Sequence, residues 1–190
     1  MEKKGKLELT WVGKYEEEKL EPRILIEDKS KSYGDPNTEN MLIHGDNLLA
    51  LKALERDYAG KIKCVYIDPP YNTGNAFEHY DDNLEHSIWL GMMRERLVLL
   101  HKLLCDEGFL CCHIDDSEGA YLKVLLDEIF GRQNYLTTIY VRVRYPEKTL
   151  KQDMAFHKEI EHIHVYRKSS SAQPILEKVS SGFEKFIYKI

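Results

Sequence analysis

A short apolar run that ends in two consecutive prolines constrains this chain more than any other feature. Residues 62–67 (Ile-Lys-Cys-Val-Tyr-Ile) are rich in β-branched and aromatic side chains, which is typical of a buried strand. The next four residues are Asp68, Pro69, Pro70 and Tyr71. Because proline has no backbone N–H and a fixed φ angle, the strand must end there. Ligands bind at the carboxyl ends of strands in open α/β sheets, so we expect a rigid binding corner at this edge.

This corner carries the groups needed to activate an exocyclic amine of a nucleobase. The lone pair of such an amine is delocalised into the ring, so the amine is a poor nucleophile. The Asp68 carboxylate and the Pro69 carbonyl can each accept one of its N–H bonds, which favours a tetrahedral, more nucleophilic nitrogen. The Tyr71 ring can stack on a base held outside its duplex. The tetrapeptide alone also fits an ordinary surface turn, so the surrounding sequence is needed to distinguish a catalytic site from a turn.

Further segments accompany the tetrapeptide along the chain. They are Leu42–Leu54, Asn72–Gly74, Trp89–Leu97, Asp106–Gly108, Ile114–Glu118 and Asp127–Gly131. In this order, over about residues 10–168, they resemble the first half of the methyltransferase subunits of type III restriction-modification systems. Asp68–Tyr71 resembles the catalytic tetrapeptide of DNA amino-methyltransferases, whose form with a leading Asp is typical of adenine-N6 enzymes.

This resemblance implies a Rossmann-like α/β methyltransferase core with S-adenosylmethionine as cofactor. It implies methyl transfer to N6 of an adenine flipped out of DNA, with Asp68, Pro69, Pro70 and Tyr71 as catalytic residues and Asp68 also in contact with the cofactor. The amine attacks the methyl group directly, so we expect no metal ion and no covalent enzyme intermediate. Besides DNA, the family allows a restriction subunit and a second copy of the chain as partners.

Other candidate site residues flank the tetrapeptide. A Gly-Asp-Asn match makes Asp46 and Asn47 candidate cofactor-binding residues, although Asp is also a favoured N-cap for the helix expected to follow. Asn72, Phe77 and Tyr80 are candidate DNA-binding residues. Exposed aromatic rings can stack on a base or fill the gap that a flipped base leaves. Both rings also suit local packing of their own loop.

The charge of the chain is uneven. The formal net charge is −5, which is unusual for a DNA-binding protein. Residues 139–190, however, hold ten Lys or Arg and six Asp or Glu, a net +4, which leaves −9 for the rest. Arg142, Arg144, Lys148 and Lys151 cluster within this part. We expect Arg142 and Arg144 to face DNA phosphates, the alternative being an ordinary solvated strand and loop.

Composition excludes several other classes of protein. Hydrophobic residues make up 43% and charged residues 31%, as in soluble globular domains, and no apolar run reaches the length of a membrane span. Cys64, Cys111 and Cys112 lie in apolar strand patterns, which indicates buried free thiols in a reducing cytoplasm. His162 and His164 share one face of a strand, but no further ligands accompany them, so we expect no metal site.

Periodicity predicts one α/β domain with a mainly parallel sheet, helices on both faces and antiparallel final strands. The expected strands are 23–26, 41–44, 62–67, 109–114, 135–144 and 159–167, and the expected helices begin at 47, 86 and 115. Asp115–Glu118 resembles a capping box, which explains its acids without a catalytic role. We divide the chain into an extension (1–40), a catalytic portion (41–168) and a linker (169–190).

One expected motif is missing. Methyltransferases of this fold need a glycine-rich turn near the methionine part of the cofactor, and no Gly-x-Gly occurs in these 190 residues. In the family that the chain resembles, this turn follows the catalytic tetrapeptide and a target-recognition region. We therefore expect an incomplete core. A non-catalytic module that binds DNA or a restriction subunit remains an alternative, as does methylation of RNA or protein through the same tetrapeptide.

Overall fold

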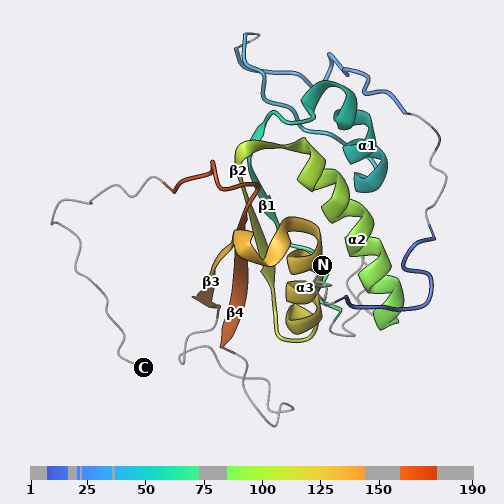
Figure 1. Cartoon of the computed structure of the whole chain (residues 1–190). Helices are drawn as coiled ribbons and strands as arrows, with labels where there is room; N and C mark the ends of the chain where they lie inside the picture. The colour runs from blue at the N-terminus through green and yellow to red at the C-terminus, as the bar shows by residue number, and fades with distance from the viewer. Residues whose placement is uncertain are drawn as a thin grey trace, which may run out of the picture.

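A computed structural model of the chain describes residues 8–16, 21, 23–35, 37–72, 85–143 and 159–174. These residues form a sheet covered by helices (Figure 1). Three of the candidate DNA-binding residues, Phe77, Tyr80 and Arg144, lie outside the described residues.

The sheet has four strands in the order β1-β2-β4-β3. The strands are β1 (Ile62–Ile67), β2 (Leu104–Ile114), β3 (Tyr135–Arg142) and β4 (Ile160–Arg167). β1 pairs with β2 in parallel, and β4 runs antiparallel to both β2 and β3. The antiparallel final strands are confirmed, but a mainly parallel sheet is wrong for the described residues. The reason is visible in β4, whose mixture of polar and apolar side chains is typical of antiparallel rather than parallel strands.

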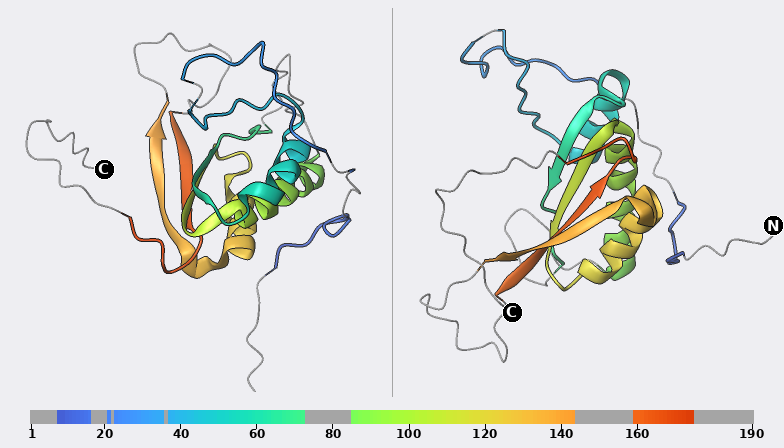
Figure 2. Two further views of the ribbon diagram at one scale, coloured as in Figure 1. Left: turned by 90° about the horizontal axis from the view of Figure 1, so that it is seen from above. Right: turned by 60° about the vertical axis from the view of Figure 1, so that its left-hand side comes forward.

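The helices lie on one side of the sheet rather than on both (Figure 2). They are α1 (Asn47–Tyr58), α2 (His86–Leu103) and α3 (Gly119–Leu126), and α3 continues into a π-helical turn (Asp127–Gly131) and a 3-10 turn (Arg132–Asn134). Gly131 ends the π-helical turn with φ 85°. On the other face of the sheet, Tyr66 is 58% exposed. The expectation of helices on both faces is therefore wrong for the described part of the chain.

The core lies between α2, α3 and the covered face of the sheet. Its fully or almost fully buried members are Trp89, Leu90, Met93, Leu97, Leu100, Leu104, Leu110, Cys112, Ile114, Leu122, Leu125, Leu126, Phe130 and Tyr166. Burial of one such large apolar side chain contributes about 1.5–3 kcal/mol. The apolar residues of α2 that repeat every three or four positions belong to this core, and Leu104, the next residue after α2, belongs to β2.

β2 begins five residues earlier than predicted. The helix ends at Leu103, and Gly108 lies inside the strand instead of ending the helix. The pairing shifts from Ile62↔Leu104 to Cys64↔Phe109, so extra residues of β2 bulge at this point. A Cβ atom on Gly108 would lie 2.9 Å from the Cys105 carbonyl oxygen and 3.0 Å from the Ile62 carbonyl oxygen. Gly108 is thus required for close backbone approach.

Two predicted strands are absent. Residues 23–26 and 41–44 have no strand structure, and Ile24 and Leu42 are 79% and 99% exposed. Their apolar side chains suggested strands, but within the described residues no neighbouring strand pairs with them. A strand needs such a partner for its backbone hydrogen bonds.

Lys14 fixes the N-terminal segment to the helical layer. Its ammonium lies 2.8 Å from Glu128 Oε1 and 3.0 Å from Glu8 Oε1, and it donates to the Leu9 carbonyl at 2.7 Å. Its side chain is only 1% exposed. Burial alone would lower the pKa of Lys14, but the carboxylates of Glu128 and Glu8 outweigh burial and raise it. The ion pair between Lys14 and Glu128 therefore holds the segment around Trp11 in place.

Replacing Lys14 by Met should lower the free energy of unfolding by about 1.5–3 kcal/mol, because Glu128 would keep a largely buried charge without its cation. Urea unfolding of the 190-residue chain, followed by circular dichroism, measures this loss. Lys52→Met is the matched control, since Lys52 pairs with Glu55 at 2.7 Å but leaves 47% of its side chain exposed. Such exposed pairs contribute about 0.2–1 kcal/mol. Equal losses in the two variants would contradict an anchoring role for Lys14.

Candidate active site

Strand ends that are distant in sequence meet at one edge of the sheet. β1 and β2 are parallel, so Ile67 and Ile114 end together, and the antiparallel β4 starts at the same edge because Ile114 pairs with His162. The end of β3 joins them through the pair of Arg142 with Ile160. This edge is the lower end of the sheet in Figure 1. The residues that follow β1 and β2 and those that open β4 therefore form one surface.

A buried tryptophan fixes the backbone of the tetrapeptide. Trp89 of α2 is fully buried, and its indole Nε1 donates a hydrogen bond of 2.8 Å to the Pro70 carbonyl oxygen. The tetrapeptide is thereby attached to the core. The sequence alone did not reveal this contact. The signal was available, because a buried indole N–H usually has a hydrogen-bond acceptor.

The hydroxyl of Tyr71 lies among carboxylates. It donates a hydrogen bond of 3.1 Å to Glu161 Oε2, and the Asp68 carboxylate interacts with the same hydroxyl. Burial, and then the carboxylates of Asp68 and Glu161, raise the pKa of Tyr71 far above its usual value. The phenol is therefore neutral at physiological pH and acts as a donor. Its ring is half-buried against the core.

Asn72, the residue after the tetrapeptide, is hydrogen-bonded to a buried carboxylate. Asn72 has a left-handed backbone with φ 59°, and its amide donates a hydrogen bond of 2.7 Å to Glu118 Oε1. Glu118 is 4% exposed, and its Oε2 lies 2.7 Å from Nδ1 of His86. The predicted capping box is wrong, because Glu118 binds Asn72 and His86 rather than the start of α3. Asp115 Oδ1 instead accepts the backbone N–H of Ser117 at 2.8 Å.

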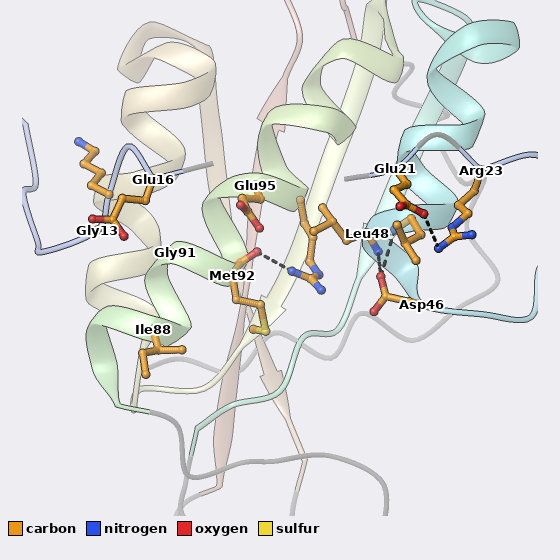
Figure 3. Close-up of a pocket in the computed structure, with 13 residues that line it drawn as sticks. Gly13, Glu16, Glu21, Arg23, Asp46, Leu48, Ile88, Gly91, Met92 and Glu95 are labelled. Carbon is orange, nitrogen blue, oxygen red and sulfur yellow. Dashed lines mark hydrogen bonds and ion pairs between the residues drawn. The ribbon is translucent and has the colours of Figure 1, made fainter. Parts of the chain in front are cut away.

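Asp46 and Asn47 lie at the start of α1. Asp46 Oδ1 accepts the backbone N–H groups of Leu48 and Leu49 at 2.9 and 3.1 Å, which confirms its N-cap role. Arg96 of α2 donates to Asn47 Oδ1 at 2.7 Å. Asp46 also lines a cavity of about 760 Å³ between the N-terminal segment, α1 and α2 (Figure 3).

The structure brings some of the predicted site residues together but separates others. Asp68–Tyr71 and Arg142 share the sheet edge, where Arg142 Nη2 lies 3.3 Å from Glu159 Oε2. None of the tetrapeptide residues lines the cavity beside Asp46. Within the described residues, Asp46 and Asp68 therefore do not share one cavity. The cavity walls carry acidic and basic side chains, including Glu95 and Arg23, beside the apolar Met92. They suit a polar ligand with an apolar part.

Other expectations concern thiols, metals and membranes. Cys112 is buried, but Cys64 is exposed because, like Tyr66, it lies on the face of the sheet that no helix covers. His164 Nδ1 lies 2.9 Å from the Thr138 hydroxyl. Among the described residues, no group of three or more His, Cys, Asp or Glu side chains is arranged to hold a metal ion. No helix in this part of the chain is long and apolar enough to cross a membrane.

Comparison with known proteins agrees with the sequence motifs. A family model described as DNA methylase matches residues 62–187. A Haemophilus influenzae protein named as the probable Mod subunit of the type III restriction-modification enzyme HindVI is 47% identical over 116 residues, which are 61% of this chain and 15% of that protein. The StyLTI Mod subunit of Salmonella typhimurium is 33% identical over 80% of this chain and 28% of its own length. The EcoPI Mod subunit of Escherichia phage P1 is 32% identical over 85% of this chain and 30% of its own length.

The chain thus spans less than a third of the length of these relatives. The family model, in contrast, matches well over half of the chain and includes the tetrapeptide. The resemblance inferred from the sequence is confirmed, and the chain belongs to the DNA methylase family.

Proposed function

We propose that these residues form the catalytic part of an adenine-N6 DNA methyltransferase of a restriction-modification system. The observation that carries this proposal is the position of Asp68–Tyr71 at the carboxyl end of β1, held by the bond from Trp89 to Pro70. The names of the relatives, which are Mod subunits of type III systems, support the restriction-modification context. A restriction subunit is accordingly a proposed partner, and a second copy of the chain is another.

The tetrapeptide would bind the target base by its amine and by its ring face. The Asp68 carboxylate and the Pro69 carbonyl accept the two N–H bonds of the amine, and the Tyr71 ring stacks on the base. Acceptors that are fixed before the base arrives need no reorganisation, which lowers the barrier to nucleophilic attack. The leading Asp supports adenine over cytosine as the target. Arg142, at the same edge, is a proposed phosphate contact.

The residues present fit S-adenosylmethionine in part. Asp46 lines a cavity of about 760 Å³ whose polar and apolar walls suit a nucleoside, and Asn47 lies next to it. The glycine-rich turn expected at the methionine end does not occur among the 190 residues. When bound, the cofactor supplies a methyl group on a positively charged sulfur. We propose that Asp46 and Asn47 at this cavity and Asp68 at the sheet edge contact different parts of the cofactor. Orientation of the base against the donor would provide much of the rate.

Asp68→Ala in the full-length protein that contains these residues should lower methyl transfer at least about 100-fold, because the base amine loses a fixed acceptor. DNA binding should survive, since phosphate contacts dominate affinity. The protein is expressed in a host without adenine methylation, and the genomic DNA of that host is sequenced for modified bases. The positions of these bases also reveal the target sequence.

The control for this experiment is Asp57→Ala, because Asp57 lies at the far end of α1 with 75% of its side chain exposed. This variant should methylate as well as the parent protein. Undiminished N6-methyladenine in the Asp68→Ala variant would refute the catalytic assignment. N4-methylcytosine in DNA from the parent protein would refute adenine as the target.

A second candidate function is a module that binds DNA or a restriction subunit without catalysis. The absence of a Gly-x-Gly turn from these 190 residues favours it for the isolated chain. DNA binding that weakens as salt is raised, without any methyl transfer by the full-length protein, would support this alternative.

The isolated 190-residue chain should bind S-adenosylmethionine only weakly, with a dissociation constant of roughly 1 mM or more. It should not methylate DNA, because Asp46 and the tetrapeptide contact only part of the cofactor. Calorimetric titration of the chain with the cofactor measures the affinity. Micromolar binding, or tritiated methyl transfer to DNA above that of a Tyr71→Ala variant, would show a complete site within these residues.

A further inference from the structure

We propose that Glu161 is a positioning residue of the active site, which takes the hydrogen bond of the Tyr71 hydroxyl and thereby leaves Asp68 available for the amine of the base. This inference rests on the proposed function, since it concerns the same tetrapeptide. Neither the tetrapeptide nor the flanking motifs indicate Glu161, which lies 90 residues after Tyr71 on another strand.

A competition between two acceptors carries the argument. A tyrosine hydroxyl has a single proton to donate. The Glu161 and Asp68 carboxylates both interact with the hydroxyl of Tyr71, and the aligned hydrogen bond, 3.1 Å long, goes to Glu161. A hydrogen bond to Asp68 instead would occupy a lone pair that the base amine needs. Glu161 therefore competes with Asp68 for this proton.

The Glu161 carboxylate is itself held in place. It belongs to β4, where it pairs with Val141 of β3, and its side chain is 19% exposed. Its Oε2 lies 2.9 Å from Nε2 of His113 on β2, and Nδ1 of that ring lies 3.1 Å from the Tyr66 hydroxyl. The contact with Nε2 is close but is not aligned as a hydrogen bond. The neighbouring imidazole ring therefore limits the movement of the Glu161 carboxylate, whose Oε2 accepts from Tyr71.

Loss of Glu161 has a consequence that a merely structural residue would not show. Without Glu161, Asp68 is the carboxylate that still interacts with the Tyr71 hydroxyl, so the hydroxyl competes with the substrate amine. Removal of that hydroxyl as well should then release Asp68. The stacking ring remains in Tyr71→Phe, and so the second substitution should rescue the first.

The experiment measures kcat for methyl transfer by the full-length protein, on DNA that contains the target sequence found by genomic sequencing. Glu161→Ala should lower kcat about 10-fold, which corresponds to one hydrogen bond of about 1.4 kcal/mol. In the Tyr71→Phe background, the additional loss of Glu161 should change kcat by less than about 3-fold, because no hydroxyl remains to compete for Asp68. Glu161→Gln should also retain kcat within about 3-fold, because its amide oxygen still accepts from the hydroxyl. Glu107→Ala, at the opposite end of β2, is the control and should leave kcat unchanged.

Two results would overturn the proposal: a Glu161→Ala variant as fast as the parent, or a Glu161→Ala substitution that lowers kcat as much in Tyr71→Phe as in the parent protein. A parent protein that transfers no methyl group refutes the proposed function but leaves the hydrogen bond testable in the 190-residue chain. There, the ¹³Cζ NMR signal of Tyr71, assigned with Tyr71→Phe, should shift in Glu161→Ala and not in Glu107→Ala. An unshifted signal in a folded Glu161→Ala chain would overturn the positioning role whatever the activity.

Discussion

The hydrogen bond from the Trp89 indole to the Pro70 carbonyl connects the core of this protein to its proposed chemistry. Trp89 is fully buried, so its N–H must find an acceptor inside the protein, and a carbonyl at the end of β1 is available. The two prolines remove backbone donors at that point, which leaves the corner without ladder bonds of its own. The buried Trp89 side chain therefore holds this corner in place, because hydrogen bonds of the sheet cannot.

The parallel pairing of β1 with β2 adds the second constraint, because it places two strand ends and the start of β4 at one edge. Acids from two separate segments then contact the residues of the corner. Glu118 holds Asn72 at 2.7 Å, and Glu161 accepts from Tyr71 at 3.1 Å. If a carboxylate activates the amine as proposed, such neighbours matter because each one changes which lone pairs of the site remain available.

The local features of the chain could be read from its sequence, whereas contacts across the sheet could not. The strand at 62–67, its end at Asp68 and the apolar stripe of α2 follow from proline chemistry and helical spacing. The roles of Glu118 and Glu161 depend on pairing between distant segments. Helix-capping rules predicted that Glu118 binds the backbone at the start of its own helix, whereas the buried Glu118 carboxylate binds the side chain of Asn72. The role of Gly108 also depends on such a contact, because only the neighbouring strand reveals why a side chain is excluded there.

The most direct test of this account is a crystal structure of the full-length protein with its DNA target and a cofactor analogue that cannot donate a methyl group. The account predicts a flipped adenine whose ring stacks on Tyr71. Its N6 atom should lie within about 3.2 Å of both the Asp68 carboxylate and the Pro69 carbonyl. A target base bound elsewhere, or an amine that contacts neither acceptor, would contradict the central claim that this corner of the sheet activates the amine.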